Sequence, residues 1–239
     1  MSENSEFKKQ VVSDEDWLAA RQRLLEKEKQ FTQLRDELSQ QRRDMPWRKI
    51  NQDYLFETEG GTKSLTELFA GKSQLIVYHF MFGPDWEEGC PSCSFWADNF
   101  NPIVTHLNQR DIHLVAVSRA SLDKLQNYRK RMGWSFDWVS SFSNSFNSDF
   151  NVSFSQQEID SGQAVYNYRP SQFPSSEAPG ISVFVKNDRG EVFHTYSCYA
   201  RGLDMLNGAY HLMDLVPKGR DEQDLPYTMA WVKRHDCYD

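Results

Sequence analysis

Residues 75–100 read LIVYHFMFGPDWEEGCPSCSFWADNF, and three patterns follow one another within them. The apolar run at 75–82 is typical of a central β-strand that is covered on both faces. A loop then leads to Cys90 and Cys93, spaced as C-x-x-C, and residues 94–100 predict a helix. A C-x-x-C pair between a strand and a helix is typical of a redox site. The sequence therefore predicts an α/β fold built around this pair.

Cys90 falls at or just before the N-terminus of the predicted helix, where the partial positive charge and free backbone N–H groups stabilise a thiolate. Cys93 lies one helical turn further along, close enough to form a small disulfide with Cys90. This pair permits thiol–disulfide exchange through a mixed disulfide, with Cys90 as the nucleophile and Cys93 as the resolving thiol. Two alternatives stay open, namely half of a zinc site and a turn with inert thiols. The residues available to complete a zinc site are Cys198, Cys237, His194 and His235, among which no second closely spaced pair occurs.

Composition and charge argue against several classes of function. The chain has 239 residues, of which 39% are apolar and 14% aromatic, as suits a globular protein. Its formal net charge of −7 argues against a nucleic-acid partner, because phosphate contacts need a basic surface. We expect no cofactor, since no phosphate-binding loop, dinucleotide fingerprint or nucleophile elbow occurs. No signal-like or membrane-length apolar run is visible, so we expect a cytoplasmic protein without a membrane partner. Thiols are kept reduced in the cytoplasm, which favours a redox-active or metal-binding pair over structural disulfides.

The first 45 residues predict a helical arm, and residues 46–239 predict the main domain. Ser13 is the expected N-cap, and the helix should run to about Arg43 and stop before Pro46. Apolar side chains recur every seven residues along this arm. They are Trp17, Leu24, Phe31 and Leu38. Such a stripe packs either on the chain's own domain or on a second subunit, so a homodimer through this helix is one of two expectations.

The remaining segments predict the element order of a thioredoxin-like domain. After the C-x-x-C helix come a strand at 111–118, a helix at 122–132 and a strand at 138–142. A long, partly irregular insertion at about 143–178 follows, of a length that usually carries function or forms a lid. A β-hairpin at 181–196 and a closing helix at 202–215 come last. The predicted fold class is a thioredoxin-like mixed sheet flanked by helices, with an N-terminal amphipathic helix and this insertion before the final hairpin.

Longer motifs resemble one bacterial family from about Val11 to the C-terminus. They occupy residues 78–86, 89–95, 115–120, 131–134 and 194–202. With them the chain resembles the thioredoxin-like domain-of-unknown-function family described as predicted dithiol–disulfide oxidoreductases. The resemblance implies a thioredoxin-like fold and a C-x-x-C dithiol that acts on a protein or small-molecule disulfide.

Four residues are candidates for supporting the cysteine pair. Thioredoxins carry a buried acid on the strand before the motif, and here that region holds Tyr78 and His79. His79 is either a satisfied core histidine or a group that exchanges a proton with the second thiol. Asp85 is either an acidic residue of a local turn or a group that tunes the reactivity of the thiols. Trp86 either packs in the loop or forms the floor of a substrate groove. Pro179 stands where thioredoxins place a cis-proline opposite the motif.

The sequence thus predicts a thioredoxin-like thiol–disulfide oxidoreductase. The alternative is a non-catalytic thioredoxin-like module for binding or oligomerisation, with structural or zinc-bound thiols. A thiol peroxidase is a weaker alternative. Residues 148–152 are faintly similar to peroxiredoxins, but Glu87 stands where those enzymes carry a Thr before the reactive cysteine.

Overall fold

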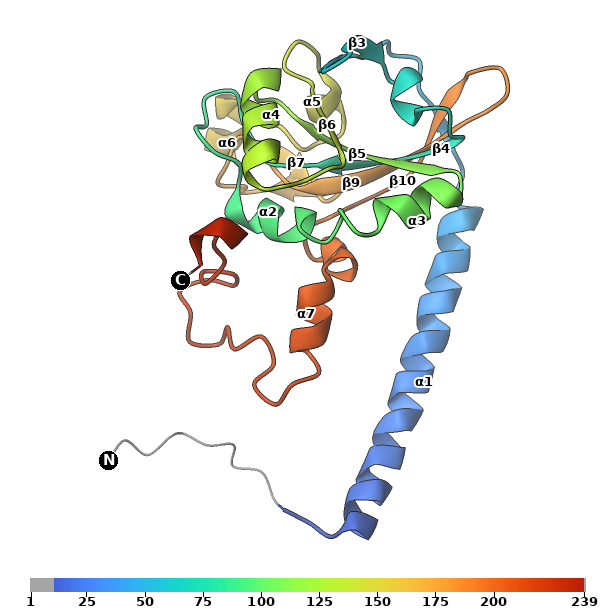
Figure 1. Cartoon of the computed structure of the whole chain (residues 1–239), viewed down its shortest axis with the longest axis vertical. Helices are drawn as coiled ribbons and strands as arrows, with labels where there is room; N and C mark the ends of the chain where they lie inside the picture. The colour runs from blue at the N-terminus through green and yellow to red at the C-terminus, as the bar shows by residue number, and fades with distance from the viewer. Residues whose placement is uncertain (1–10, 239) are drawn as a thin grey trace. The chain divides into compact units, whose positions relative to one another are not determined.

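The computed structural model describes residues 11–238, and the chain divides into two compact units between Pro46 and Trp47. The described part of the first unit is mainly one long helix, α1, Asp14–Asp44 (Figure 1). The second unit holds the sheet and the cysteine motif. Within the described residues, no helix combines the length and the apolar character that crossing a membrane requires.

Helix α1 begins and ends where local chemistry predicts. The Ser13 hydroxyl accepts a hydrogen bond from the Asp16 N–H at 3.1 Å, which satisfies a donor that the first turn leaves free. Acidic residues fill the first turn and basic residues the last, as the helix dipole favours. Met45 leaves the helical conformation just before Pro46. Every residue of α1 remains at least partly exposed.

The second unit is built on a mixed sheet whose described strands have the order β1-β10-β9-β4-β5-β6-β2-β3. These strands are β1 Arg48–Lys49, β2 Leu55–Thr58, β3 Gly61–Ser64, β4 Gln74–His79, β5 Ile112–Ser118, β6 Asp137–Ser140, β9 Gly180–Lys186 and β10 Val192–Tyr199. Strands β4, β5 and β6 are parallel, whereas β9 pairs antiparallel with both β4 and β10. Parallel strands joined by helices and completed by an antiparallel hairpin make the thioredoxin-like fold that the sequence predicts.

Each face of this sheet carries its own apolar cluster. On one face pack α2 Pro91–Ala97, α3 Val104–Gln109 and α4 Leu122–Arg131, with Tyr78 and Trp96 at the centre of the cluster. On the other face lie a short 3-10 helix at Glu67–Phe69 and α5 Phe146–Asp149. The alternation of side chains along β4 divides its residues between the two clusters.

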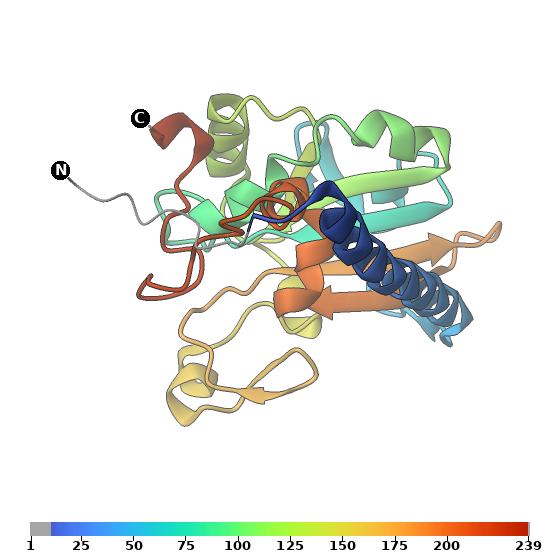
Figure 2. The same ribbon diagram turned by 90° about the horizontal axis from the view of Figure 1, so that it is seen from below.

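The insertion at 143–178 has more regular structure than the sequence predicts. Besides α5 it contains α6 Gln156–Ser161 and the hairpin of β7 Ala164–Tyr166 and β8 Arg169–Ser171. These elements form a lobe beside the main sheet (Figure 2). A capping box between Ser155 and Glu158 starts α6. A small apolar cluster holds the lobe together, with members Val152, Phe154, Ala164, Tyr166, Ala178 and Tyr199. The sequence does not predict these elements because each is too short for its apolar residues to show the repeat of a helix or a strand.

The predicted closing helix at 202–215 is two shorter elements. A 3-10 helix spans Ala200–Leu206, and α7 spans Gly208–Met213. Asn207 separates them, because its side chain accepts a hydrogen bond from the Tyr210 N–H at 3.1 Å and so caps a new helix. The chain then returns toward the cysteine motif and ends in a 3-10 turn at His235–Cys237.

Candidate active site

Cys90 is the N-cap residue of α2, and Pro91 occupies the first helical position. Proline suits that position because its fixed φ is helical and it has no N–H to leave unpaired. The Cys90 N–H donates to the Met81 carbonyl at 3.1 Å, which ties the motif to the chain just beyond β4. The Ser94 N–H and hydroxyl both donate to the Cys90 carbonyl, each at 3.0 Å. The Cys90 thiol is therefore held, partly buried, at the positive end of a helix.

The two thiols of the motif have opposite pKa shifts. A hydrogen bond from the Cys93 thiol lowers the pKa of Cys90 to about 7, and the backbone N–H groups of Cys93 and Ser92 act in the same direction, against the effect of burial. Burial raises the pKa of the Cys93 thiol well above its ordinary value, and this residue is only 2% exposed. Near neutral pH, Cys90 thus supplies the thiolate and Cys93 the thiol that donates to it. Thiol–disulfide exchange requires a thiolate in this position.

Tyr78 is the residue of β4 that faces the pair. Its hydroxyl donates to the Cys93 carbonyl at 3.3 Å, and it also forms a hydrogen bond with the Cys93 side chain. Burial raises the pKa of Tyr78 well above its usual range, so the hydroxyl keeps its proton and remains a donor. The phenol therefore favours the charged form of Cys93, whereas burial of the sulfur opposes it.

His79 lies on the other face of β4, so the hypothesis that it exchanges a proton with Cys93 is wrong. Its buried ring lies beside Phe146 and Phe150, with ring centroids 5.6 and 5.9 Å away. Its Nε2 atom is 2.8 Å from the hydroxyl of Ser182. Burial lowers the pKa of His79 to about 3, so the ring is neutral near pH 7. The residue is a core histidine, but not the fully satisfied one that the sequence offered as the other possibility, because its buried Nδ1 has no hydrogen-bond partner among the described residues.

The loop residues Asp85 and Trp86 form no hydrogen bond with either thiol of the motif among the described contacts. Asp85 is exposed, and within the described chain no hydrogen bond connects it to either cysteine. Trp86 is half-buried and packs over Gly83, where a Cβ atom would come within 2.9 Å of the indole nitrogen. The Lys124 ammonium donates to the Trp86 carbonyl at 2.8 Å and fixes this loop. Trp86 therefore shapes the loop that leads to the motif.

Pro179 lies beside the motif, but the expectation of a cis-proline is wrong, because no cis peptide bond occurs among the described residues. The insertion holds this segment extended, since the Ala178 N–H donates to the Val152 carbonyl at 2.9 Å. The Tyr166 hydroxyl also donates to the Pro179 carbonyl, at 2.8 Å. Pro179 and Cys93 line a pocket of about 270 Å³. Its other lining residues, which are mainly apolar, are Tyr78, Met81, Ser92, Trp96, Ala200, Arg201, Leu203, Asp204 and Met229.

The C-terminal segment packs against the motif loop (Figure 1). Arg234 donates to the Gly89 carbonyl through Nη2 and to the Tyr128 hydroxyl through Nε, both at 2.9 Å. A third contact joins Arg234 to the Glu88 carboxylate at 2.9 Å. Because Gly89 directly precedes Cys90, these contacts hold the entry to the motif in place.

The other two cysteines, Cys198 and Cys237, are not part of the C-x-x-C pair. Cys198 is buried in the same apolar cluster as Cys93, with its sulfur 3.6 Å from the Gly202 carbonyl oxygen. Cys237 is exposed, and Arg131 Nη2 lies 3.5 Å from its sulfur. Between residues 11 and 238, no group of three or more His, Cys, Asp or Glu side chains is placed to hold a metal ion. In this part of the chain, a zinc ion bound by Cys90 and Cys93 would therefore have no third protein ligand of these types.

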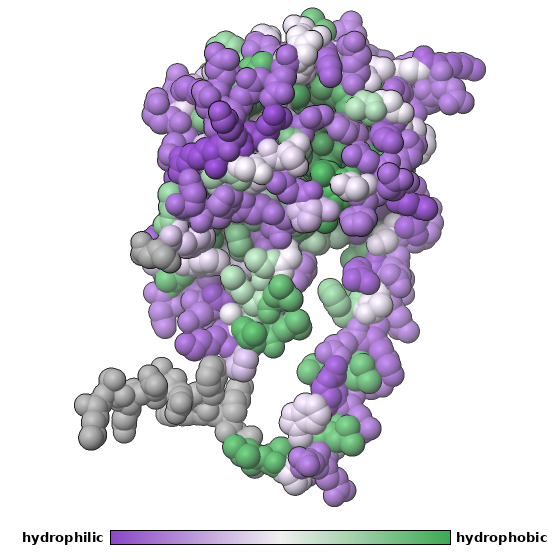
Figure 3. Space-filling model, viewed as in Figure 1, coloured by the Kyte–Doolittle hydropathy of each residue, from purple (hydrophilic) through white to green (hydrophobic). Residues whose placement is uncertain are grey.

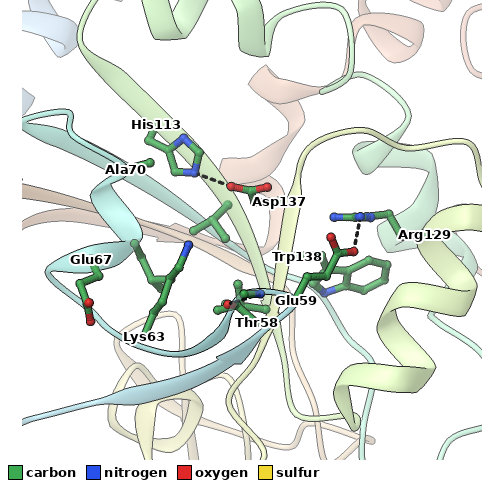
Figure 4. A pocket seen from close by; sticks show the side chains of 13 residues that line it. Thr58, Glu59, Lys63, Glu67, Ala70, His113, Arg129, Asp137 and Trp138 are labelled. Atoms are coloured by element: carbon green, nitrogen blue, oxygen red, sulfur yellow. Dashed lines mark hydrogen bonds and ion pairs between the residues drawn. The ribbon is translucent and has the colours of Figure 1, made fainter.

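A polar pocket of about 230 Å³ lies near the amino ends of β5 and β6, away from the motif (Figure 4). His113 and Asp137 face each other there, with Nε2 and the carboxylate 3.1 Å apart. Arg129 forms an ion pair with Glu59 on the same rim. None of the predicted site residues lines this pocket. The candidate site remains the cysteine pair.

The sequence matches a family model described as "Bacterial protein of unknown function (DUF899)" over residues 6–238. The chain belongs to this family. The match spans both units and agrees with the thioredoxin-like family that the motifs predict. No curated protein matches the sequence.

Several solved peroxiredoxin structures are similar to this chain at low sequence identity. A cysteine-to-serine mutant of peroxiredoxin Q from Xanthomonas campestris is 15% identical, with a TM-score of 0.45, covering 66% of this chain and 90% of its own. Peroxidoxin BcpB from Mycobacterium tuberculosis is 11% identical, with a TM-score of 0.46, covering 68% of this chain and 93% of its own. A cysteine-to-serine mutant of PrxQ from Xylella fastidiosa is 13% identical, with a TM-score of 0.45, covering 70% and 94%. A likeness at this level says nothing about activity.

Two residues at the site, Tyr78 and Arg234, could not be identified from the sequence. Tyr78 stands inside an apolar run, where a tyrosine is most simply a core residue, and only the facing of β4 toward Cys93 distinguishes it from His79. Arg234 lies near the end of the chain, and no pattern links it to the loop that it holds. The aromatic residues near Arg234 signal that the tail docks, but they do not indicate where.

Proposed function

We propose that this chain is a thiol–disulfide oxidoreductase that cycles Cys90 and Cys93 between dithiol and disulfide. One observation carries the proposal: the half-buried Cys90 caps α2 and has a pKa lowered to about 7 by the buried Cys93 beside it. An inert pair of thiols needs neither a helix N-terminus nor this division between a thiolate and a protonated donor. Together these features supply an accessible nucleophile and a second thiol one turn away.

The reaction begins when the Cys90 thiolate attacks one sulfur of a substrate disulfide. A Cys90–substrate mixed disulfide forms, and the other substrate sulfur leaves as a thiolate that takes a proton from solvent. Cys93 then gives up its proton to solvent and attacks the Cys90 sulfur, so that the Cys90–Cys93 disulfide forms and the second substrate thiolate leaves. Two electrons have passed from the protein dithiol to the substrate. An external dithiol must return them before the next cycle.

Tyr78 assists the second half of this reaction as a positioning residue. Its hydroxyl donates to the Cys93 carbonyl and lies within hydrogen-bond reach of the Cys93 sulfur, so its proton can turn to the sulfur when that becomes a thiolate. Burial of Cys93 opposes that charge, so the protonated thiol persists until the mixed disulfide has formed. Because Cys93 keeps its proton until then, its hydrogen bond stabilises the Cys90 thiolate until a substrate arrives.

The pocket beside Cys93 favours a disulfide that carries an apolar group. Met81, Trp96 and Leu203 contribute apolar surface, and the volume of about 270 Å³ suits a group the size of one large side chain. An apolar residue next to a cystine in a protein, or an aromatic small-molecule disulfide, supplies such a group. A cytoplasmic setting, in which thiols are kept reduced, belongs to the same proposal.

The test is the reduction potential of the pair, measured by equilibrating the protein with glutathione buffers and counting its thiols. We expect a reversible two-electron transition between about −120 and −300 mV. The variant Cys90→Ser should lose the reduction of an aromatic disulfide, and Cys93→Ser should accumulate a mixed disulfide visible as added mass. Cys237→Ser is the matched control, because it removes an exposed thiol elsewhere and should leave both properties unchanged. Full reductase activity in Cys90→Ser would refute the proposal.

The same samples distinguish the alternatives. If no transition occurs and the thiols resist exchange, the protein is a non-catalytic binding module. If protein purified without added metal carries one zinc ion per chain, the thiols are zinc ligands. If the protein reduces peroxide with a thiol reductant faster than it reduces disulfides, the chain is a thiol peroxidase.

A further inference from the structure

Helix α1 presents an apolar stripe that nothing within its own unit covers. Trp17 is 61% exposed, Leu24 54%, Phe31 67% and Leu38 41%. Figure 3 shows apolar patches spaced along this helix. Helices in proteins gain most of their stability from packing an apolar face rather than from helix propensity. A helix of 31 residues without one buried side chain therefore lacks the contact that would hold it.

The spacing of the stripe is that of a coiled coil. With Trp17, Leu24, Phe31 and Leu38 at the first position of each heptad, the fourth position holds the apolar Ala20 and Leu34 in the first and third heptads and Lys27 in the second. The stripe covers three heptads between residues 17 and 38, a rise of about 32 Å at about 1.5 Å per residue. The repeat of seven, rather than eleven, favours a left-handed supercoil.

Charges beside the stripe select a partner and a direction. In a parallel pair, the seventh position of one heptad faces the fifth position of the next heptad on the other helix. Here that rule brings together Asp16 with Arg21, Arg23 with Glu28, Gln30 with Arg35 and Glu37 with Arg42, each residue facing its mate on a second copy. Three of these pairs join opposite charges, and none joins like charges. We propose that α1 pairs with α1 of a second copy of this chain as a parallel, in-register coiled coil.

An antiparallel pair fits the charges less well. Aligned on its centre, it would set Glu28 against Glu28 of the other copy, and Arg21 against Arg35. Acids and bases are nearly balanced in α1, with eight against seven, so two copies can approach without strong repulsion. Lys27 is the one charge at a seam position. Its stem can pack in the seam while its ammonium turns outward toward Glu28 of the other copy.

The experiment is the mass of the full chain in solution, measured by sedimentation equilibrium with variants that act on the stripe. The native chain should have twice the 28.0 kDa mass of one chain. Leu24→Glu should give a monomer. Leu215→Glu is the matched control, because Leu215 is 80% exposed outside α1 and its change should leave the dimer intact. Thermal unfolding of the main domain should be the same in both variants, which shows that Leu24→Glu has not unfolded it.

Charge exchange tests the direction of the helices. Arg23→Glu should raise the dimer dissociation constant roughly three- to tenfold, because it places like charges opposite each other in both copies. The double variant Arg23→Glu with Glu28→Arg should restore the native constant, whereas Lys29→Glu, at an outward position of the heptad, should change it little. A monomeric native chain, or a dimer that survives Leu24→Glu, would overturn the proposal. Failure of the double variant to restore binding would overturn the parallel arrangement.

Discussion

Removal of the Cys93 thiol should raise the pKa of Cys90 and slow its reaction with alkylating agents. The structure lowers the pKa of Cys90 from 9.0 to about 7, which corresponds to about 3 kcal/mol in favour of the thiolate. The hydrogen bond from Cys93 makes the largest contribution to this shift, and burial opposes it. In Cys93→Ala the donor is gone and the burial remains. The pKa should then return to about 8.5 or above, so that the thiolate fraction at pH 7 falls from about half to about 3%.

The assay is the rate of alkylation of Cys90 by iodoacetamide as a function of pH, with the modified residue located by mass spectrometry. A Cys237→Ser background removes the exposed thiol that would react in parallel. In the native pair the rate should be high above pH 7 and fall as the pH drops through about 7, since only the thiolate reacts. Cys93→Ala should shift that midpoint upward and reduce the rate at pH 7 about tenfold or more. Cys93→Ser, whose hydroxyl still donates, should lie between the two.

Two results would refute this reasoning. If Cys93→Ala titrates at the same pH as the native protein, the backbone donors at the start of α2 hold the thiolate alone, and the thiol donor has no part. If the native midpoint lies near that of an ordinary cysteine, the site does not activate Cys90 at all.

Three further predictions concern residues around the motif. Tyr78→Phe should slow the step in which Cys93 resolves a mixed disulfide by about tenfold in stopped-flow measurements, because a donor to the forming thiolate is lost; an unchanged rate would remove Tyr78 from the mechanism. Arg234→Met should leave the Gly89 carbonyl with only the longer bond from the Tyr128 hydroxyl and increase hydrogen exchange of the motif loop, and equal exchange in both proteins would contradict it. Burial raises the pKa of Glu177 to about 7, so the stability that its proton provides is present below about pH 4.5 and is lost as the pH rises through 7. Glu177→Gln should therefore flatten the loss of unfolding free energy between about pH 4.5 and 7, by at most about 3 kcal/mol in urea titrations, and an identical pH dependence would contradict the assigned pKa.

The raised pKa of Glu177 holds although an arginine lies next to it. Arg119 approaches the carboxylate at 3.2 Å and favours its charged form, as does the hydrogen bond from Ser153. Glu177 is buried, whereas the side chain of Arg119 is 32% exposed and partly hydrated. Desolvation of the carboxylate is therefore the larger effect, and the attraction offsets only part of it.

Strong local patterns made most of the fold predictable from sequence. The run at 75–82 indicated a covered strand, although β4 ends at His79 and residues 80–82 lie beyond it; Ser13 and Pro46 bounded a helix, and the C-x-x-C pair marked the start of another. The insertion was harder because its helix and hairpin are stabilised by tertiary contacts among scattered aromatic residues. The split at Asn207 likewise depends on one side-chain cap inside a helical pattern.

The site shows why position on a strand matters more than residue type. His79 is the one strongly polar residue in its apolar run, and chemistry alone made it the candidate partner of Cys93. Neighbouring strand residues point to opposite faces, so only one of Tyr78 and His79 can reach the cysteines. The helix that carries Cys93 packs on the face of Tyr78, and this choice of face is made by the connection between β4 and β5 rather than by either side chain. A run that is apolar on both faces has no polar side to mark that choice, so the phenol at the site looked like an ordinary core residue.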